Sequence, residues 1–253
     1  MMNDPASIVD DGSDAPANRP RSVAPERGIG WWTDAWALFM GNALMWLALG
    51  LIFAVGAMVI GMVPVLGSVA LCLLTPVLAG GWMLAAHKVH GGGALEVADL
   101  FAGFRQDRIG PLLVLGALLL AAMVAIALVA GALGAGAVYG LAMGGMRHGM
   151  GSMAAGVGAG FAAVALALVL GALVTTAWWF APALVVLRKA PPVQALQLSV
   201  EATLKNVMPF VLFGLIGIVA TIVASIPFGL GWLVLLPVSM LAAFVSYRDV
   251  FEP

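Results

Sequence analysis

Six stretches of this chain are apolar and uncharged for about 18 residues or more, a length with which an α-helix crosses the hydrocarbon core of a bilayer. None of them alternates apolar and polar residues as the strands of a membrane β-barrel do. The sequence therefore predicts an all-α fold, a polytopic membrane helical bundle with six transmembrane helices. The stretches are Asn42–Met62, Leu66–Ala86, Pro111–Val138, Gly158–Leu187, Pro209–Ile226 and Phe228–Tyr247.

The composition supports a membrane location and excludes several functions. Of the 253 residues, 63% are hydrophobic and 9% are charged, whereas a soluble domain carries about a quarter charged residues. The net charge of -1 lacks the basic surface that nucleic-acid binding requires. The single cysteine, Cys72, lies in an apolar stretch, so no disulfide framework or cysteine metal cluster is expected.

The spans are expected to pair as three hairpins with both chain ends in the cytoplasm. Two connections, residues 63–67 and 226–231, are short, uncharged and rich in Pro and Gly, which is typical of tight turns. With six spans, every Lys and Arg except Arg147 falls on one side of the membrane. The positive-inside rule makes that side cytoplasmic, and the bacterial cytoplasmic (inner) membrane is the expected location.

An internal repeat accounts for the hairpins. Units 30–90, 94–190 and 191–250 each contain an amphipathic stretch, a span, a turn and a second span with a proline. Those prolines are Pro76, Pro182 and Pro237. We expect each amphipathic stretch to form an interfacial helix before its hairpin. Chance similarity among apolar helices is the alternative explanation.

The first 28 residues differ from the rest of the chain. They are rich in Asp and Pro, have no apolar period, and lack the order of a secretory signal peptide. We expect residues 1–28 to form a disordered cytoplasmic tail. Residues 29–253 are expected to form a single transmembrane domain.

Several short motifs of this chain lie at Val63–Gly67, Leu74–Gly80, Asp99–Arg105, Phe180–Val186, Pro191–Leu196 and Ser246–Phe251. Together they resemble an uncharacterised family of proteobacterial six-helix inner-membrane proteins. The resemblance extends over about Gly30 to Phe251 and implies an integral membrane protein of unknown function, without catalytic or binding residues to carry over.

Catalysis and coupled transport find little support in the spans. No Asp, Glu, Lys or Arg lies within them, and such residues are the usual proton and ion carriers inside membranes. Hydroxyl groups at Thr175, Thr176, Thr221 and Ser225 are candidate polar patches, but these groups also bond within their own helices. His87 and His90 with Glu96 and Asp99 are compatible with a metal site, although interfacial polar residues are the favoured interpretation.

The segment between the third and fourth spans has an unusual composition. A Gly/Met-rich periplasmic connector is expected at about 139–157. Thioethers and imidazole suit Cu(I), so a copper site is one interpretation and a flexible or membrane-associated connector is the favoured one. The candidate ligands are Met143, Met146, His148, Met150 and Met153. Glycines spaced by four residues are also compatible with close helix packing or with a homo-oligomer contact.

The favoured function is that of a non-enzymatic inner-membrane protein that binds lipid or a protein partner. Membrane lipids are the expected partners, a homo-oligomer or a membrane protein partner is a further candidate, and no nucleic acid is expected. No cofactor is expected apart from the candidate copper. A small-solute channel or permease and Cu(I) binding by the Met/His segment are the alternatives.

Overall fold

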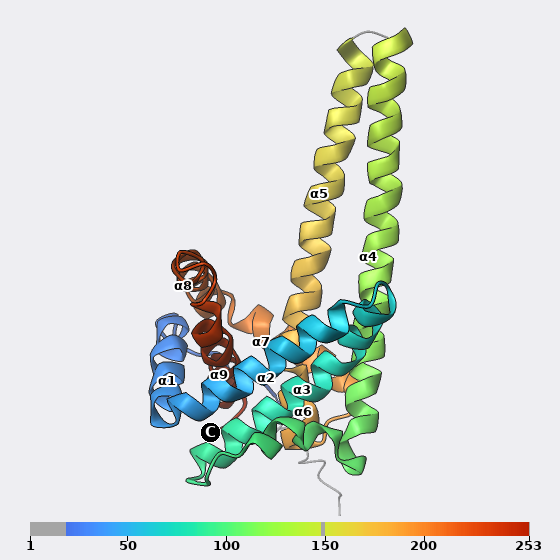
Figure 1. Cartoon of the computed structure of the whole chain (residues 1–253). Coiled ribbons are helices and arrows are strands. Elements are labelled where there is room, and N and C mark those ends of the chain that lie inside the picture. The colour runs from blue at the N-terminus through green and yellow to red at the C-terminus, as the bar shows by residue number, and fades with distance from the viewer. Residues whose placement is uncertain (1–18, 148–149, 253) are drawn as a thin grey trace, which may run out of the picture.

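Every regular element of the described chain is a helix (Figure 1). The computed structural model describes residues 19–147 and 150–252, with the side chains of 140 and 143–155 outside the description. The all-α prediction is confirmed. The elements in chain order are α1 (Arg27–Gly41), α2 (Ala43–Gly61), α3 (Leu66–His90), the 3-10 helix η1 (Val97–Phe104), α4 (Gln106–Arg147), α5 (Met150–Trp179), α6 (Ala181–Arg188), α7 (Pro192–Lys205), α8 (Val207–Ser225) and α9 (Trp232–Phe251).

Six helical segments of the described chain are long and apolar enough to cross a membrane, as predicted. They are α2, α3, α4, α8, α9 and the α5–α6 pair. They pair as the hairpins α2–α3, α4–α5/α6 and α8–α9. A short helix precedes each hairpin: α1, η1 and α7, which we call the elbow helices. The three units of the chain are thus α1–α3, η1–α6 and α7–α9.

Each elbow helix packs mainly on the hairpin of the preceding unit. Helix η1 lies against α3 of the first unit, and α7 lies against α5 and α6 of the second. Helix α1 lies against α8 and α9 of the third unit, although these elements come from opposite ends of the sequence (Figure 1). The second unit thus contacts the first, the third contacts the second, and the first contacts the third. These contacts of the elbow helices close the three units into a ring.

Glycines permit the closest of these contacts, between η1 and α3. A Cβ atom on Gly81 would lie 2.0 Å from the carbonyl oxygen of Leu100, and one on Gly103 would lie 2.0 Å from the carbonyl oxygen of Val77. Both distances are far below van der Waals contact, so only glycine allows the two backbones to touch here.

Much of the core lies in the second helix of each hairpin, after its proline. Pro76, Pro182 and Pro237 are all buried. The most buried large side chains that follow them include Trp82 and Phe244, which are at most 1% exposed. The predicted pattern of three prolines therefore marks the start of a shared core.

At Pro182 the helix breaks into α5 and α6, and an elbow helix bonds the backbone groups at the break. Proline lacks an N–H and clashes with the preceding turn, which leaves backbone groups without helical partners. Ser199 of α7 accepts a hydrogen bond from the Phe180 amide at 3.0 Å and donates one to the Thr176 carbonyl at 2.7 Å. The second unit is thereby tied to the elbow helix of the third.

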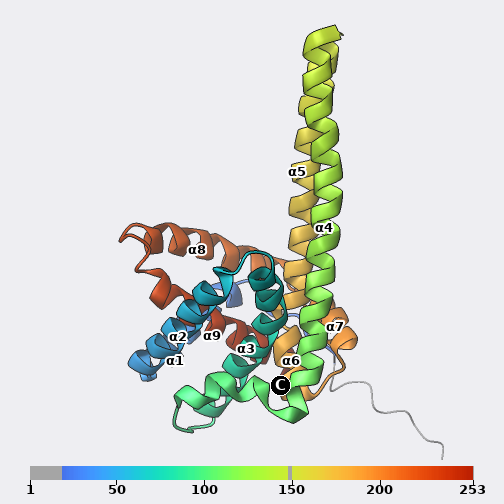
Figure 2. The same cartoon turned by 45° about the vertical axis from the view of Figure 1, so that its right-hand side comes forward.

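The α4–α5 hairpin extends far beyond the other two (Figures 1 and 2). Helix α4 has 42 residues, whereas α2 and α8 have 19 each. At 1.5 Å per residue these are about 63 Å and about 28 Å, against a hydrocarbon core of about 30 Å. We call residues 128–147 and 150–168, at the end away from the elbow helices, the far half of this hairpin.

The Gly/Met-rich connector expected at 139–157 differs from the structure. Helix α4 continues past the expected end of its span, Val138, to Arg147, and α5 already begins at Met150. Helix pairing explains the difference: a Cβ atom on Gly156 would lie 2.9 Å from the backbone nitrogen of Leu141, so this glycine serves close packing of the two helices.

The expected disordered tail, residues 1–28, is also corrected in part. Residues 1–18 lie outside the described residues. Residues 19–26 follow a defined path to the start of α1 at Arg27, and hydrogen bonds to α9 and to the α7–α8 junction hold it. No local pattern predicts this path, because the contacts are with residues about 180 to 230 positions away.

Candidate functional site

Charged residues from distant parts of the chain meet at one end of the molecule, which we call the basic end. Arg27 pairs with Asp249, Lys88 pairs with Asp99, and Arg248 Nη1 donates to His90 Nδ1 at 3.1 Å. The first and last described segments also meet there, since the Arg21 amide donates to the Val250 carbonyl at 2.9 Å. The two ends of the described chain therefore lie on the same side.

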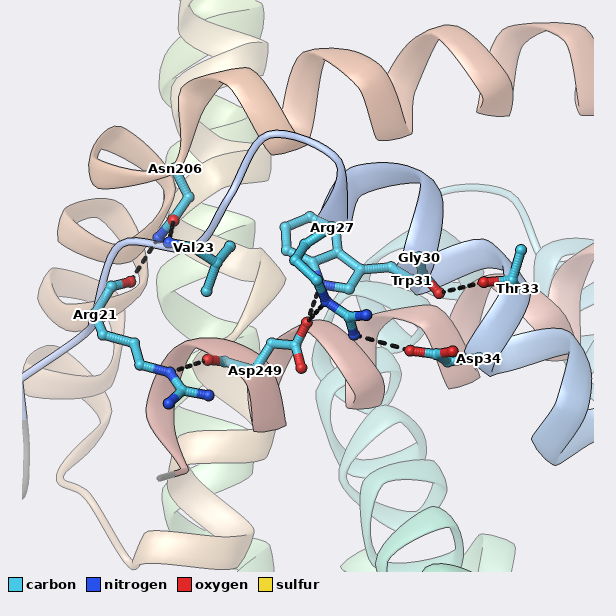
Figure 3. A network of polar contacts seen from close by, with 9 residues as sticks. All are labelled: Arg21, Val23, Arg27, Gly30, Trp31, Thr33, Asp34, Asn206 and Asp249. Atoms are coloured by element: carbon cyan, nitrogen blue, oxygen red, sulfur yellow. Dashed lines mark hydrogen bonds and ion pairs between the residues drawn. The ribbon is translucent and has the colours of Figure 1, made fainter.

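Asp249 is the centre of the contact between α1 and α9 (Figure 3). Its Oδ2 atom accepts hydrogen bonds from Arg27 Nε at 2.5 Å and from Trp31 Nε1 at 2.9 Å. Arg27 also pairs with Asp34 at 2.8 Å. The hydrogen bond to Asp249 is the largest cause that raises the pKa of Arg27 above its ordinary value, so the pair is held in its charged form.

Asn206, at the junction of α7 and α8, binds the segment before α1 (Figure 3). Its Oδ1 accepts from the Val23 amide at 2.8 Å, and its Nδ2 donates to the Arg21 carbonyl at 3.0 Å. Asn206 is 1% exposed, and its side chain bonds two backbone groups of the segment before α1. The Arg21 side chain in turn donates to the Asp249 carbonyl.

The other two elbow helices have comparable polar contacts with the preceding hairpin. Lys88, near the end of α3, bonds the carboxylate of Asp99 in η1 at 3.0 Å. Asp99 also caps η1 by accepting from the Glu96 amide at 2.8 Å. With the contacts of Asp249 and of Ser199, each elbow helix thus has at least one polar contact with the hairpin of the preceding unit.

A charged cavity of about 380 Å³ opens beside Asp249. Three arginines and three carboxylates line it, and most of them already pair with one another, as Arg248 does with Glu252 at 2.9 Å. Such balanced pairing is typical of a structural network. The lining residues are Arg21, Arg27, Asp34, Ala37, Leu38, His90, Val245, Arg248, Asp249 and Glu252.

An apolar cavity of about 210 Å³ lies between η1 and the α2–α3 hairpin, and we call it the η1 groove. Among its lining residues only Thr75 has a side-chain polar group, and that hydroxyl donates to the Leu71 carbonyl of its own helix at 2.6 Å. The wall therefore presents carbon atoms. The lining residues are Ile52, Phe53, Gly56, Ala57, Ile60, Leu71, Leu74, Thr75, Leu78, Leu100, Phe101 and Phe104.

A second apolar cavity, of about 390 Å³, lies at the corresponding place in the ring, between α1 and the α8–α9 hairpin. Trp32 and Trp36 of the elbow helix form one wall, and Val223 and Leu235 are among the residues of the other. The two cavities share one design: an elbow helix with aromatic side chains covers an apolar hairpin.

The candidate copper ligands are not tested by the structure. His148 lies outside the described residues, and Met143, Met146, Met150 and Met153 lie in α4 and α5 at positions whose side chains are not described. Copper binding by this segment stays a prediction.

His87, His90, Glu96 and Asp99 do not assemble as a metal site. The described residues contain no group of three or more His, Cys, Asp or Glu side chains placed to hold a metal ion. Instead, Glu96 and Asp99 lie near Lys88, while His90 bonds Arg248. The interpretation as interfacial polar residues accounts for these contacts.

Three of the four hydroxyl groups considered as a polar lining are bonded within their own helices. Thr175 donates to Gly171, Thr176 to Leu173 and Ser225 to Thr221, each through a backbone carbonyl. These contacts leave no observation in the described chain that favours a channel over a packed helix bundle.

Sequence reasoning missed Asp249 and Asn206, two polar residues that bond α1 and the segment before it to the third unit. One signal was present: Asn42 and Asn206 stand at the same place in the first and third units, between the elbow helix and its hairpin. Both have similar backbone angles, with φ -146° and ψ 41° at Asn42 and φ -122° and ψ 36° at Asn206. This similarity supports the repeat.

Comparison with known proteins identifies the family of this chain. Residues 26–249 match the family described as a domain of unknown function, DUF7847, and the chain belongs to that family. A protein of Burkholderia thailandensis described as a probable inner membrane protein is 30% identical over 199 residues, which cover 77% of this chain and 73% of the relative. No solved structure matches the chain.

Proposed function

We propose that this chain is a non-enzymatic protein of the bacterial inner membrane that binds phospholipid, with an acyl chain in the η1 groove and the basic end in the cytoplasm. The observation that carries the proposal is the carbon-lined groove beneath an elbow helix. The name of the Burkholderia relative supports the inner-membrane location. The concentration of Lys and Arg at one end supports the orientation, because such residues stay in the cytoplasm.

The form of the groove fits an acyl chain better than a polar solute. A polar ligand would lose its hydrogen bonds with water and find no partner, because the Thr75 hydroxyl is already bonded to Leu71. Phe101 and Phe104 are 47% and 37% exposed, so the groove is bordered by aromatic side chains that a lipid chain can contact.

Shape, rather than escape from water, must provide the affinity. A lipid chain that moves from the bilayer into the groove exchanges one apolar environment for another, so the hydrophobic effect contributes little. Van der Waals contacts with a preformed wall remain. A bulky side chain placed inside the groove is therefore expected to remove the binding.

Gly56 offers such a position. A Cβ atom there would meet no other atom within 4 Å, and the same holds for Gly131, which lies on the exposed surface of α4. Gly56→Phe fills the groove, whereas Gly131→Phe adds the same ring elsewhere. Both variants would be reconstituted in nanodiscs with phosphatidylethanolamine and phosphatidylglycerol, released into detergent, and examined by native mass spectrometry.

We expect the wild-type chain and Gly131→Phe to retain at least one phospholipid that Gly56→Phe has lost. Equal retention by the two variants would contradict binding in the η1 groove.

A further inference from the structure

Besides the charged cavity beside Asp249, another cavity lies at the basic end, between the first turn of α4 and the end of α6. Its volume is about 280 Å³. We call it the basic pocket. Its wall combines charged side chains with apolar ones, unlike the carbon wall of the η1 groove. The lining is formed by Asp107, Arg108, Pro111, Val185, Val186, Lys189 and Ala190.

The charge of this pocket is positive and little neutralised. Arg108 and Lys189 line it against the single carboxylate of Asp107. Arg108 Nε lies 3.4 Å from Asp107, whose side chain is 64% exposed, and exposed pairs of this kind contribute little. Lys189 and the neighbouring Arg105 have no ion pair among the described residues. The pocket therefore suits an anion.

The backbone at Lys189 is a separate observation. Its φ of 55° and ψ of 29° place it in the left-handed region directly after α6, where glycine is the usual residue. A side chain there strains the backbone. The turn is nevertheless ordered, since the Ala190 amide bonds the Leu184 carbonyl at 3.2 Å. It holds a lysine, rather than glycine, at the wall of the pocket.

The neighbouring arginine does not compete for this pocket. Arg188 donates to the hydroxyl of Tyr247 at 3.1 Å and stacks over the rings of Tyr247 and Phe251. Its charge is thus engaged toward α9, whereas Lys189 belongs to the pocket between α4 and α6. The first turn of α4 contributes the positive end of a 42-residue helix to the same place.

The surroundings favour the headgroup of a lipid over a free anion. Beyond Pro111, the outer surface of α4 is uncharged and exposes apolar side chains such as Val114 and Leu118. A lipid whose phosphate lies between Arg108 and Lys189 therefore has an apolar surface for its chains. Basic pockets between transmembrane helices on the cytoplasmic side are suited to anionic headgroups.

We infer that the basic pocket binds the phosphate of an anionic phospholipid, and that the side chains of Arg108 and Lys189 contact this phosphate. This site is distinct from the η1 groove, where shape selects the acyl chain. Here charge selects the headgroup. The two sites are therefore tested by different variants and different readouts.

The test compares headgroups rather than total lipid. The full chain is placed in nanodiscs with equal amounts of phosphatidylglycerol and phosphatidylcholine, and native mass spectrometry measures the ratio of the two lipids retained. We expect the wild-type chain to prefer phosphatidylglycerol by about tenfold and Arg108→Gln/Lys189→Gln to lose most of that preference. Arg19→Gln/Lys205→Gln is the matched control, because it removes the same charge elsewhere at the basic end and is expected to keep the preference.

Two further arms keep the result decisive. The variant Arg108→Lys/Lys189→Arg retains both charges and is expected to retain the preference, even if the glutamine variant fails to fold. Inorganic phosphate at about 10 mM, which raises the ionic strength only slightly, tests whether a free anion displaces the lipid headgroup. Displacement of phosphatidylglycerol by inorganic phosphate, or equal preference in the glutamine variant and its control, would overturn the inference. Gly56→Phe is expected to leave the headgroup ratio unchanged.

Discussion

The basic end and the far half of the α4–α5 hairpin are built from similar apolar helices but differ in what their side chains contact. At the basic end, Trp31 and Trp82 are at most 1% exposed, and each elbow helix has a polar tie to another unit. In the far half, Phe161 is 74% exposed and Leu168 is 69% exposed. Tertiary contacts therefore hold the fold together at the basic end, whereas the far half depends on the pairing of two helices.

The largest difference is expected for aromatic truncation. Trp31 packs on Phe210 and Phe213 with ring centroids 5.1 Å and 6.0 Å away, and its indole N–H bonds Asp249. Trp31→Ala is expected to lower the free energy of unfolding by about 3 to 5 kcal/mol. Phe161→Ala in the far half is expected to change it by about 0.5 kcal/mol or less. Unfolding in mixed micelles measures both, and similar losses would contradict the comparison.

The contact between η1 and α3 provides the next test. Gly103→Ala would place a methyl group against the Val77 carbonyl, at 2.0 Å before any movement. We expect a loss of about 3 kcal/mol, because η1 must move away from α3. Thermal unfolding in detergent shows the loss as a lowered Tm, and an unchanged Tm would show that this contact is dispensable.

A smaller effect is expected for Asp249→Asn. The amide can still accept a hydrogen bond but loses the charge that pairs with Arg27. The expected loss is about 1.5 to 3 kcal/mol, since this hydrogen bond involves charged groups in a partly buried place. Asp107→Asn, at a pair whose carboxylate is 64% exposed, is the matched control and should cost about 0.5 kcal/mol. Denaturant midpoints that fall equally in both variants would argue against a special role for Asp249.

The smallest expected effect is an increase in stability rather than a loss. A Cβ atom on Gly136 in the far half meets no other atom within 4 Å. Gly136→Ala is therefore expected to stabilise the chain by about 0.5 to 1 kcal/mol, because alanine loses less conformational freedom in a helix. A fall in Tm would instead indicate that another surface packs closely on this glycine.

Much of the local structure follows from the sequence. The six spans were found because an uncharged stretch of about 20 apolar residues has no stable place except a bilayer. The repeat was visible in the positions of Pro76, Pro182 and Pro237, and the elbow helices were visible in their amphipathic spacing. The end of α4 was misjudged, because glycine content around 139–157 indicated a connector where pairing with α5 maintains a helix.

The candidate sites were harder to predict from the sequence than the helices. Nothing local connects Phe101 with Gly56, or Lys189 with Arg108, and the cavities exist only because η1 lies on α3 and α6 lies beside α4. Residues 19–26 likewise have no apolar period, and their path depends on Asn206 and Asp249.

Hydropathy and charge act over a few turns of helix, so they suffice to predict the six spans and their pairing as hairpins. Which elbow helix covers which hairpin, and how the first unit meets the third, follows only from contacts between distant parts of the chain. That choice depends on close backbone contact at Gly81 and Gly103 and on buried donors finding acceptors such as Asp249. Such contacts are between residues far apart in the chain, and neither residue lies in a local sequence pattern that predicts the contact.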